Sequence, residues 1–383
     1  MAAFKAIIVG LFFTVFIYIT HQMVRYADLT TGQTFFIIGF IAILFAIVIS
    51  MPLFFWSQSE TRSETKPWHD PYFSAAHFSM AYISFLLSFI ILRDIAGFLL
   101  NFTQPEFVGT QLYGAEATGL LLVVPLAMLL LGTLVVRLGA KVIQVKIEFD
   151  QLPQGLNDLR IVHVTDLHVA PGLPVKFVQK LVEKINQLNA DLVVFTGDIL
   201  DDHAIRHIPE LEILKSVHSK YGTYFVAGNH EYYWNIEEGL SAFRTIGYKV
   251  LVNQTETLEI NGSTLQISGL ADPAARQFGK EPPDLDKLVS QQKSDAFKIF
   301  LAHQPAIADK ACEKGFDLQL SGHTHGGQFF PWNFLIVFFQ RYPKGLYQLK
   351  KMQLYVNQGT GYWGPSLRLG TFCELTEITL KKA

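Results

Sequence analysis

Four long apolar runs at the start of this 383-residue chain constrain its fold more than any other feature. They cover residues 4–20, 34–56, 75–92 and 117–136. A helix needs about 20 consecutive apolar residues to cross the hydrocarbon core of a bilayer. The first run has only a weak basic start and no small-residue cleavage site, unlike a signal peptide. We therefore predict a membrane domain of four transmembrane helices over residues 1–145, followed by a second domain over residues 146–383.

The overall composition agrees with two regions in different solvents. Half of the residues are hydrophobic and 17% are charged, against roughly 25% charged in an ordinary soluble domain. The formal net charge of −2 leaves no global basic field, so we expect no nucleic-acid partner. The two cysteines, Cys312 and Cys373, make no disulfide framework, which is consistent with a reducing compartment.

Lysine and arginine near the helix ends indicate the orientation in the membrane. Four spans place both termini on one side, and the opposite side collects Arg25 and Arg93. The side of the termini collects six basic residues: Lys5, Arg62, Lys66, Arg137, Lys141 and Lys146. This excess predicts a multi-pass cell-membrane protein whose N-terminus and second domain are cytoplasmic. We interpret Arg93 and the adjacent Asp94 as an interfacial helix end, after a third span that ends at residue 92.

Beyond residue 146, short β-rich runs alternate with helical ones. A helix is expected after Pro174, and residues 259–262 (Glu-Ile-Asn-Gly) predict a hairpin with a type I′ turn. Strands are expected at residues 159–164, 192–195, 224–227, 297–302 and 318–320. The predicted fold class is an α-helical membrane domain followed by an α/β domain, in which helices flank mixed β-sheets.

Polar side chains follow these predicted strands at the points where the strands end. In open α/β sheets, binding sites form at the carboxyl ends of the strands, so we expect these groups to lie together. A single histidine is explained as well by a core or surface position, and only the whole set indicates a site. The set comprises Asp166, His168, Asp198, Asn229, His230, His303, His323 and His325.

The motifs around these residues resemble those of a known family. In chain order they are Asp166-x-His168, Gly197-Asp198-Ile199-Leu200-Asp201, Gly228-Asn229-His230-Glu231, His303 and Gly322-His323-Thr324-His325. Over about 160 residues they resemble the calcineurin-like metallophosphoesterase superfamily. Residues 323–328 and 357–361 resemble the membrane-associated branch of that superfamily, which has N-terminal transmembrane helices. The resemblance implies an αββα sandwich and a metal-dependent phosphoric ester hydrolase.

The same resemblance implies two divalent metal ions, with Asp198 as the bridging ligand. The remaining ligands would be Asp166, His168 and His325 for the first ion and Asn229, His303 and His323 for the second. Imidazole, carboxylate and amide donors together favour Mn, Fe or Zn over Mg or Ca. His230 would be the general acid, and Asp201 would fix its tautomer.

Residues 329–339, which we call the apolar segment, contain nine large apolar residues in eleven. Arg341 and Lys344 follow. Periodicity leaves two interpretations open. The segment is either a buried strand or core helix, or a loop that enters the bilayer or binds acyl chains, with the two cations on lipid headgroups. The aromatic residues that could extend the same wall are Tyr232, Tyr233 and Trp234.

Taken together, these features predict a membrane-anchored two-metal phosphoesterase that cleaves a phosphodiester or pyrophosphate bond in a lipid-linked substrate. Its expected partners are the lipid bilayer and that substrate. A phosphomonoesterase would share the ligand set, and a non-catalytic membrane sensor or scaffold would share the fold, so both alternatives stay open. Asp272, which precedes Pro273, either lines the site or serves as a turn carboxylate.

Overall fold

A computed structural model describes residues 2–57 and 68–383 of the chain. It divides into two compact units, residues 1–134 and 135–383, which we call the first and second units. The domain boundary predicted at residue 145 stays a prediction, although the first strand of the second unit already begins at Lys141. Arg62 and Lys66, which contribute to the predicted orientation, lie outside the described residues.

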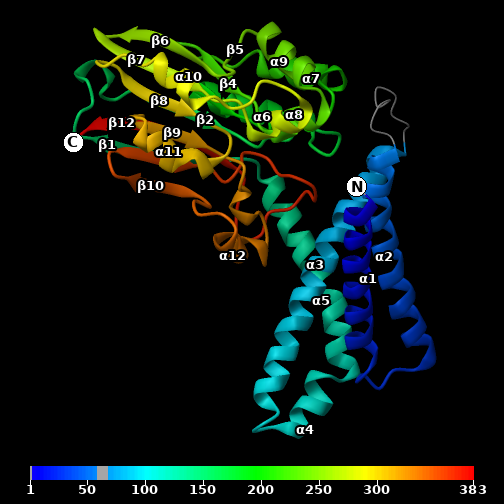
Figure 1. The fold of residues 1–383 in the computed structure, drawn as a ribbon. Helices are drawn as coiled ribbons and strands as arrows, with labels where there is room; N and C mark the ends of the chain where they lie inside the picture. The colour runs from blue at the N-terminus through cyan, green and yellow to red at the C-terminus, as the bar shows by residue number, and fades with distance from the viewer. Residues whose placement is uncertain (1, 58–67) are drawn as a thin grey trace. The chain divides into compact units, whose positions relative to one another are not determined.

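The first unit consists mainly of long apolar helices (Figure 1). They are α1 (Ala2–Val24), α2 (Thr31–Ser57), α3 (His69–Leu100), α4 (Pro105–Phe107), the π-helix η1 (Val108–Leu112) and α5 (Ala115–Arg137). Within the described ranges, three segments are long and apolar enough to cross a membrane: Thr31–Met51, His69–Leu100 and Ala115–Arg137. The corresponding stretch of α1, Val9–Val24, is shorter. The chain is thus a membrane protein by these spans, and a fourth crossing by α1 stays a prediction.

α3 continues past the helix end predicted at residue 92, so the interpretation of Arg93 and Asp94 as a helix end is wrong. Arg93 is buried, and its guanidinium donates to the Asp94 carboxylate at 3.0 Å. A buried ion pair is costly unless further hydrogen bonds satisfy it. Here the Gln22 carbonyl accepts from Arg93, and the hydroxyls of Tyr18 and Tyr113 donate to Asp94. The pair therefore connects α3 to α1.

The second unit contains two six-stranded mixed sheets (Figure 1). The first has the order β1 (Lys141–Phe149), β12 (Glu374–Lys382), β2 (Arg160–Val164), β3 (Leu192–Thr196), β4 (Thr223–Val226) and β5 (Lys249–Val250). The second has the order β10 (Gly345–Leu349), β11 (Met352–Val356), β9 (Leu318–Ser321), β8 (Phe297–Leu301), β7 (Ser263–Gly269) and β6 (Gln254–Ile260). The predicted mixed sheets are confirmed.

Alternation along the strands builds three apolar layers around these sheets. In β2, Ile161 belongs to the core shared with the second sheet, whereas Val162 faces the core on the helical side. Helices cover both outer faces, which gives the αββα order. The helices are α6 (Val175–Gln187), α7 (Ile208–Leu214), α8 (Asn229–Trp234), α9 (Ile236–Thr245), α10 (Leu285–Ser290), α11 (Ala308–Glu313) and α12 (Trp332–Leu335).

Two local predictions in this unit are also confirmed. α6 follows Pro174 and buries one stripe of apolar side chains, among them Leu181 and Ile185. Asn261 and Gly262 connect β6 to β7, and both have positive φ (50° and 76°). A two-residue loop with both central residues at positive φ is the type I′ turn, which matches the twist of the strands that it joins.

Candidate metal centre

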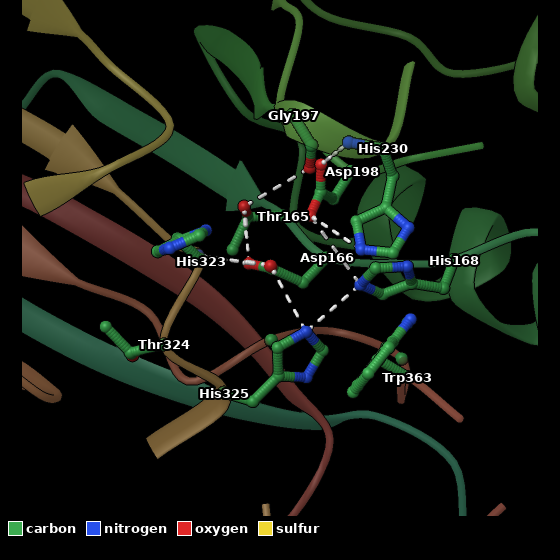
Figure 2. A network of polar contacts seen from close by, with 12 residues as sticks. Thr165, Asp166, His168, Gly197, Asp198, His230, His323, Thr324, His325 and Trp363 are labelled. Atoms are coloured by element: carbon green, nitrogen blue, oxygen red, sulfur yellow. Dashed lines mark hydrogen bonds and ion pairs between the residues drawn. The ribbon is translucent and has the colours of Figure 1, made fainter. Parts of the chain in front are cut away.

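The candidate ligands lie at the carboxyl ends of five strands. β2, β3 and β4 are parallel neighbours in the first sheet, and β8 and β9 are parallel neighbours in the second. The chain leaves each of these strands directly into a candidate residue, so the ligand loops converge at one end of the sandwich. The structure brings together all nine residues predicted for the site (Figure 2 shows six of them): Asp166, His168, Asp198, Asp201, Asn229, His230, His303, His323 and His325.

One cluster of donor atoms comprises Asp166, His168 and His325. The Nε2 atoms of the two histidines lie 3.0 Å apart, and His325 Nε2 lies 3.3 Å from Asp166 Oδ1 (Figure 2). Asp198 Oδ2 lies 3.9 Å from His168 Nε2. These are the residues that the sequence predicts for the first metal ion.

A second cluster comprises Asp198, His303 and His323. His303 Nε2 lies 3.1 Å from Asp198 Oδ2, 3.2 Å from Asn229 Oδ1 and 3.2 Å from His323 Nδ1. Asp198 Oδ2 therefore lies near a histidine of each cluster, as a bridging carboxylate must. The ligand assignment itself stays a prediction.

The donor chemistry of both clusters fits divalent cations. His303 Nε2 carries at most one proton, yet three polar atoms lie within 3.2 Å of it, and two histidine nitrogens face each other across the first cluster. A cation in each cluster would satisfy these lone pairs together, whereas hydrogen bonds among the side chains can satisfy only some of them. Imidazole and carboxylate donors of this kind bind Mn, Fe or Zn.

The backbone of the site is strained at the candidate ligands. Five of them adopt positive φ, a region that non-glycine residues rarely occupy. They are Asp166, His168, Asp198, His323 and His325, with φ between 51° and 73°. Strain of this kind persists only where the surrounding structure enforces it, and it concentrates at functional sites.

A glycine permits one of the closest approaches in the site. A Cβ atom added at Gly322 would lie 2.1 Å from both Asp166 Oδ2 and Thr165 Oγ1. Glycine has no side chain, so the backbone at Gly322 can approach closely. The amide of His323 therefore reaches the Asp166 carboxylate, to which it donates at 2.9 Å. This contact fixes one ligand loop against another.

His230 forms a third group of donor atoms with His168 and Asp198, and it is held by Asp201. Its Nδ1 is 2.6 Å from Asp201 Oδ1, which also accepts from Trp234 Nε1 at 2.9 Å. Burial lowers the pKa of His230, but the carboxylates of Asp201 and Asp198 outweigh burial and raise that pKa to about 9. The pair therefore favours a protonated imidazole whose Nε2 points toward Asp198, 4.0 Å away.

Comparison with known proteins places this arrangement in a family. The family model for calcineurin-like phosphoesterases matches residues 159–327. The chain is 40% identical over 233 residues to an uncharacterized metallophosphoesterase of Campylobacter jejuni, covering 60% of this chain and 61% of that protein. It is 33% identical over 252 residues to a transmembrane protein with metallophosphoesterase domain from Danio rerio, covering 63% of this chain and 58% of that protein. The chain thus spans less than two thirds of the length of these two relatives.

A relative from Bacillus subtilis decides the family. The uncharacterized metallophosphoesterase YkuE is 31% identical over 241 residues, which cover 60% of this chain and 82% of that protein. The chain belongs to the calcineurin-like metallophosphoesterases. Its described residues also include three segments that are long and apolar enough to span a membrane.

Glu231 positions the metallophosphoesterase site, a role that was not predicted from the sequence. Its buried carboxylate accepts hydrogen bonds from the backbone amides of Asp198, Ile199, Leu200 and Gly228, at 2.7–3.0 Å. These bonds hold the loop after β3 against the loop after β4. The motif Gly228-Asn229-His230-Glu231 already contained this residue, and an acidic side chain beside two candidate site residues was a usable signal.

Arg368 was also missed, and nothing in the motifs pointed to it. It is fully buried, and its guanidinium donates to the carbonyl groups of His325, Gln358, Gly359 and Gly361. Arg368 Nη2 also lies 3.2 Å from His325 Nδ1. A planar guanidinium with five N–H donors can satisfy such a ring of carbonyls, which a lysine cannot. Arg368 therefore ties the His325 loop to the loop after β11.

The predicted aromatic wall is only partly present. Tyr233 is half exposed, and its ring centroid lies 5.0 Å from that of His230. Tyr232 is buried in the core beside the first sheet, so the prediction for Tyr232 is wrong. Trp234 is partly buried and donates to Asp201, so its part in the wall stays a prediction. Trp363, which the sequence analysis did not name, provides a second partly exposed ring 5.8 Å from His230 (Figure 2).

Burial and hydrogen bonding bear on two further alternatives. Asp272 caps the 3₁₀-helix η4 (Pro273–Phe278), because its Oδ1 accepts from the Ala274 amide at 2.8 Å. This is the turn role, but Asp272 Oδ2 also accepts from Gln304 Nε2 at 3.0 Å, next to His303, so a part in lining the site stays a prediction. Over residues 332–339 of the apolar segment most large side chains are exposed, from 36% for Leu335 to 80% for Phe338. The alternative of a buried strand or core helix is therefore wrong there.

Proposed function

We propose that this metallophosphoesterase uses two metal ions to hydrolyse a phosphodiester or pyrophosphate bond in a lipid-linked substrate, on the cytoplasmic side of the membrane. The observation that carries the proposal is the His230–Asp201 pair (2.6 Å) beside two donor clusters, with Asp198 in the second cluster and 3.9 Å from His168 of the first. Such a site combines a place for cations that bind a phosphate with a protonated imidazole that can serve a leaving group.

In this proposal, different residues of the chain hold the metal ions, protonate the leaving group and orient the acid. Divalent ions held by the two clusters would activate water and neutralise charge on the phosphate. Asp198 faces both clusters and so sets their spacing. As water attacks phosphorus and the bond to the leaving oxygen breaks, His230 donates its Nε2 proton to that oxygen. Asp201 accepts a hydrogen bond from Nδ1 and holds the ring in place, which stabilises the protonated imidazolium form of His230.

The membrane-borne substrate is supported by two features of the chain. Its spanning helices hold the second unit at a bilayer. The exposed apolar residues of the segment begin seven positions after His325, so an acyl-binding surface starts close to the metal ligands along the chain. A substrate with its phosphate at the headgroup level would satisfy both features.

Relative rates on three substrates test the proposal. Purified full-length protein in nanodiscs with Mn²⁺ should hydrolyse bis-p-nitrophenyl phosphate faster than p-nitrophenyl phosphate, and a diacyl phosphodiester in the bilayer faster than either. Faster turnover of the monoester would favour the phosphomonoesterase alternative. Failure to bind metal or to turn over any of the three would favour a sensor or scaffold.

The cytoplasmic location rests on the excess of lysine and arginine, and cysteine labelling tests it. Cys373 is buried and Cys312 is half-buried, so neither reports accessibility well. In a Cys312→Ser background, Lys180→Cys on α6 should resist an impermeant maleimide in intact cells. Thr103→Cys, in the exposed turn after α3, is predicted to lie outside and should react. The reverse pattern would invert the topology.

A further inference from the structure

The tip of the apolar segment presents a continuous run of exposed apolar side chains. They lie on α12, which Figure 1 shows beside β10, on the 3₁₀-turn η7 (Ile336–Phe338) and on the residue that follows it. The exposed fractions are 66% for Phe334, 57% for Val337, 80% for Phe338 and 74% for Phe339. Soluble surfaces rarely expose so many large apolar side chains together, and such patches mark contact with a protein or a membrane.

The root of the segment is firmly fixed, so this exposure is not the consequence of a loose loop. Phe329 is buried and forms a β-bridge with Leu369. The Gln328 side chain donates to the Trp363 carbonyl at 2.8 Å and accepts from the Trp363 amide at 3.0 Å. A Cβ at Gly327 would lie 2.3 Å from the Trp332 carbonyl oxygen, so the backbone of α12 packs directly on the ligand loop.

The backbone of the tip is also suited to an apolar solvent. The amides of Phe334 and Leu335 donate to the Pro331 carbonyl, and those of Phe339 and Gln340 donate to the Ile336 carbonyl. Backbone groups that enter hydrocarbon must find partners within the chain, and helical turns provide them. An irregular loop of the same composition would carry unsatisfied amides into the bilayer.

The charges around the tip fit an anionic surface. Residues 318–373 contain no aspartate or glutamate, but they contain five lysines and arginines. Arg368 is buried in the site, and Arg341 pairs with Asp309 at 2.7 Å. The lysines of this stretch are exposed: Lys344, Lys350 and Lys351. Lysines beside a membrane-contacting surface are attracted by anionic headgroups, and salt screens that attraction.

We propose that α12 and η7 insert into the headgroup–acyl boundary of the same bilayer that the helices cross, with Lys344 at the headgroup level. The tether supports this partner, because only residues 138–140 separate the end of α5 from the start of β1. Four residue steps span at most roughly 14 Å. An interfacial apolar element typically enters the bilayer by roughly 5–10 Å. The inference concerns the bilayer itself and holds whatever ester the metals cleave.

Insertion would bring the ligand loop to the membrane surface. The side-chain stem of Lys344 lies against the ligand loop, since a Cβ at Gly326 would be 3.1 Å from Lys344 Cδ. If the Lys344 ammonium group lies among the lipid phosphates, it therefore limits the distance between the loop around His325 and the headgroups. The inserted segment would then set the distance between the metal centre and the membrane surface.

Lipid quenching of a site-specific fluorophore tests the insertion. Full-length protein with Cys312→Ser and Phe338→Cys carries an NBD label and is placed in nanodiscs of phosphatidylcholine and phosphatidylglycerol. We expect a blue-shifted emission and strong quenching by lipids that carry a doxyl group near the top of the acyl chain. The matched control, Lys180→Cys on α6, should show neither effect. Phe334→Cys provides a second position on the tip in case the first variant does not fold.

Each outcome decides for or against insertion. Equal, weak quenching at residues 338, 334 and 180 would overturn the proposal. A blue shift without lipid quenching would also overturn it, because a second copy of the chain or another protein surface would then cover the tip. Replacement of Lys344 by glutamine should reduce quenching in anionic nanodiscs and change it little in pure phosphatidylcholine. An equal reduction in both would remove Lys344 from the headgroup contact.

Discussion

The ligand loop at residues 323–325 and the tip at residues 332–339 are six residues apart, yet they differ in almost every physical respect. The loop is partly buried, has backbone residues at positive φ and is held by Asp166 and Arg368. The tip is exposed, apolar and built from ordinary helical turns. Contact with water alone does not explain the structure of either region. The loop presents donor atoms that could hold a cation, and the tip presents apolar side chains to its surroundings.

The two regions should therefore respond differently to substitution. Each left-handed residue in the ligand loops costs on the order of 1–3 kcal/mol, which the surrounding contacts must offset. Changes there propagate through shared partners, and their effects are not additive. Changes at the tip remove side chains that touch little of the protein, so they should alter function at the membrane and leave folding intact. The following predictions test this contrast, from the largest effect to the smallest.

The largest effect is expected from Asp198→Ala, which should lose both metal ions and all metal-dependent turnover. Asp198 Oδ2 lies near a histidine of each cluster, so its loss should affect both. Elemental analysis of the purified variant measures the loss.

Asp198→Asn tolerates positive φ better than alanine and separates loss of charge from backbone strain. Asp286→Ala, at an exposed surface pair with Lys314, is the control and should keep its metals. A full metal complement in Asp198→Ala would remove the bridging assignment.

The second effect is expected from His230→Ala, which should keep its metals but lose about 10²–10⁴-fold in turnover, the usual contribution of a general acid. The loss should shrink for esters with acidic leaving groups, because these need little protonation. A series of substituted phenyl diesters measures this trend. Equal losses across the series would argue against His230 as the acid, and loss of metal would make it a structural residue.

Much of this molecule could be predicted from the sequence, because its strongest signals are local. The apolar runs, the β-strand pattern around β2 and β3, and the Asn261-Gly262 turn all report structure from neighbouring residues. The nine site residues come together because each lies within a few residues of the carboxyl end of a strand. A motif of a few consecutive residues carries that information.

Other features depend on contacts between distant residues, and so the sequence alone did not show them. Arg368 meets His325 across 43 positions, and no spacing rule links an isolated arginine to a histidine motif. The end of α3 was predicted too early, because two adjacent charged residues, Arg93 and Asp94, are typical of a helix end at the membrane surface. The hydroxyls of Tyr18 and Tyr113 donate to Asp94, and these partners are distant in the sequence. Burial of the apolar segment was undecidable because periodicity alone does not separate a core helix from an exposed one.

A third and smaller effect is expected from Arg368→Lys, which should weaken metal binding about 10–100-fold, as changes to residues behind metal ligands usually do. An ammonium group cannot reach the four carbonyls that the guanidinium joins, so His325 should lose its fixed position. Calorimetric titration with Mn²⁺ measures the affinity. Arg341→Lys, at an exposed pair with Asp309, is the matched control and should have no effect. Unchanged affinity in Arg368→Lys, with native far-UV circular dichroism, would contradict the positioning role.

The smallest effect on the protein itself is expected when Phe334, Phe338 and Phe339 are all replaced by serine. Exposed substitutions usually change the free energy of unfolding by no more than about 0.5 kcal/mol each, so the variant should keep its stability, its metals and its turnover of bis-p-nitrophenyl phosphate. Turnover of an acylated phosphodiester in nanodiscs should fall, because each phenylalanine that enters the bilayer contributes about 1.5–3 kcal/mol. The ratio of the two rates isolates the membrane contact from the chemistry. If both rates fall together, or if metal is lost, the tip supports the ligand loop through the contact between Gly327 and α12, and the two regions are one structural element rather than two.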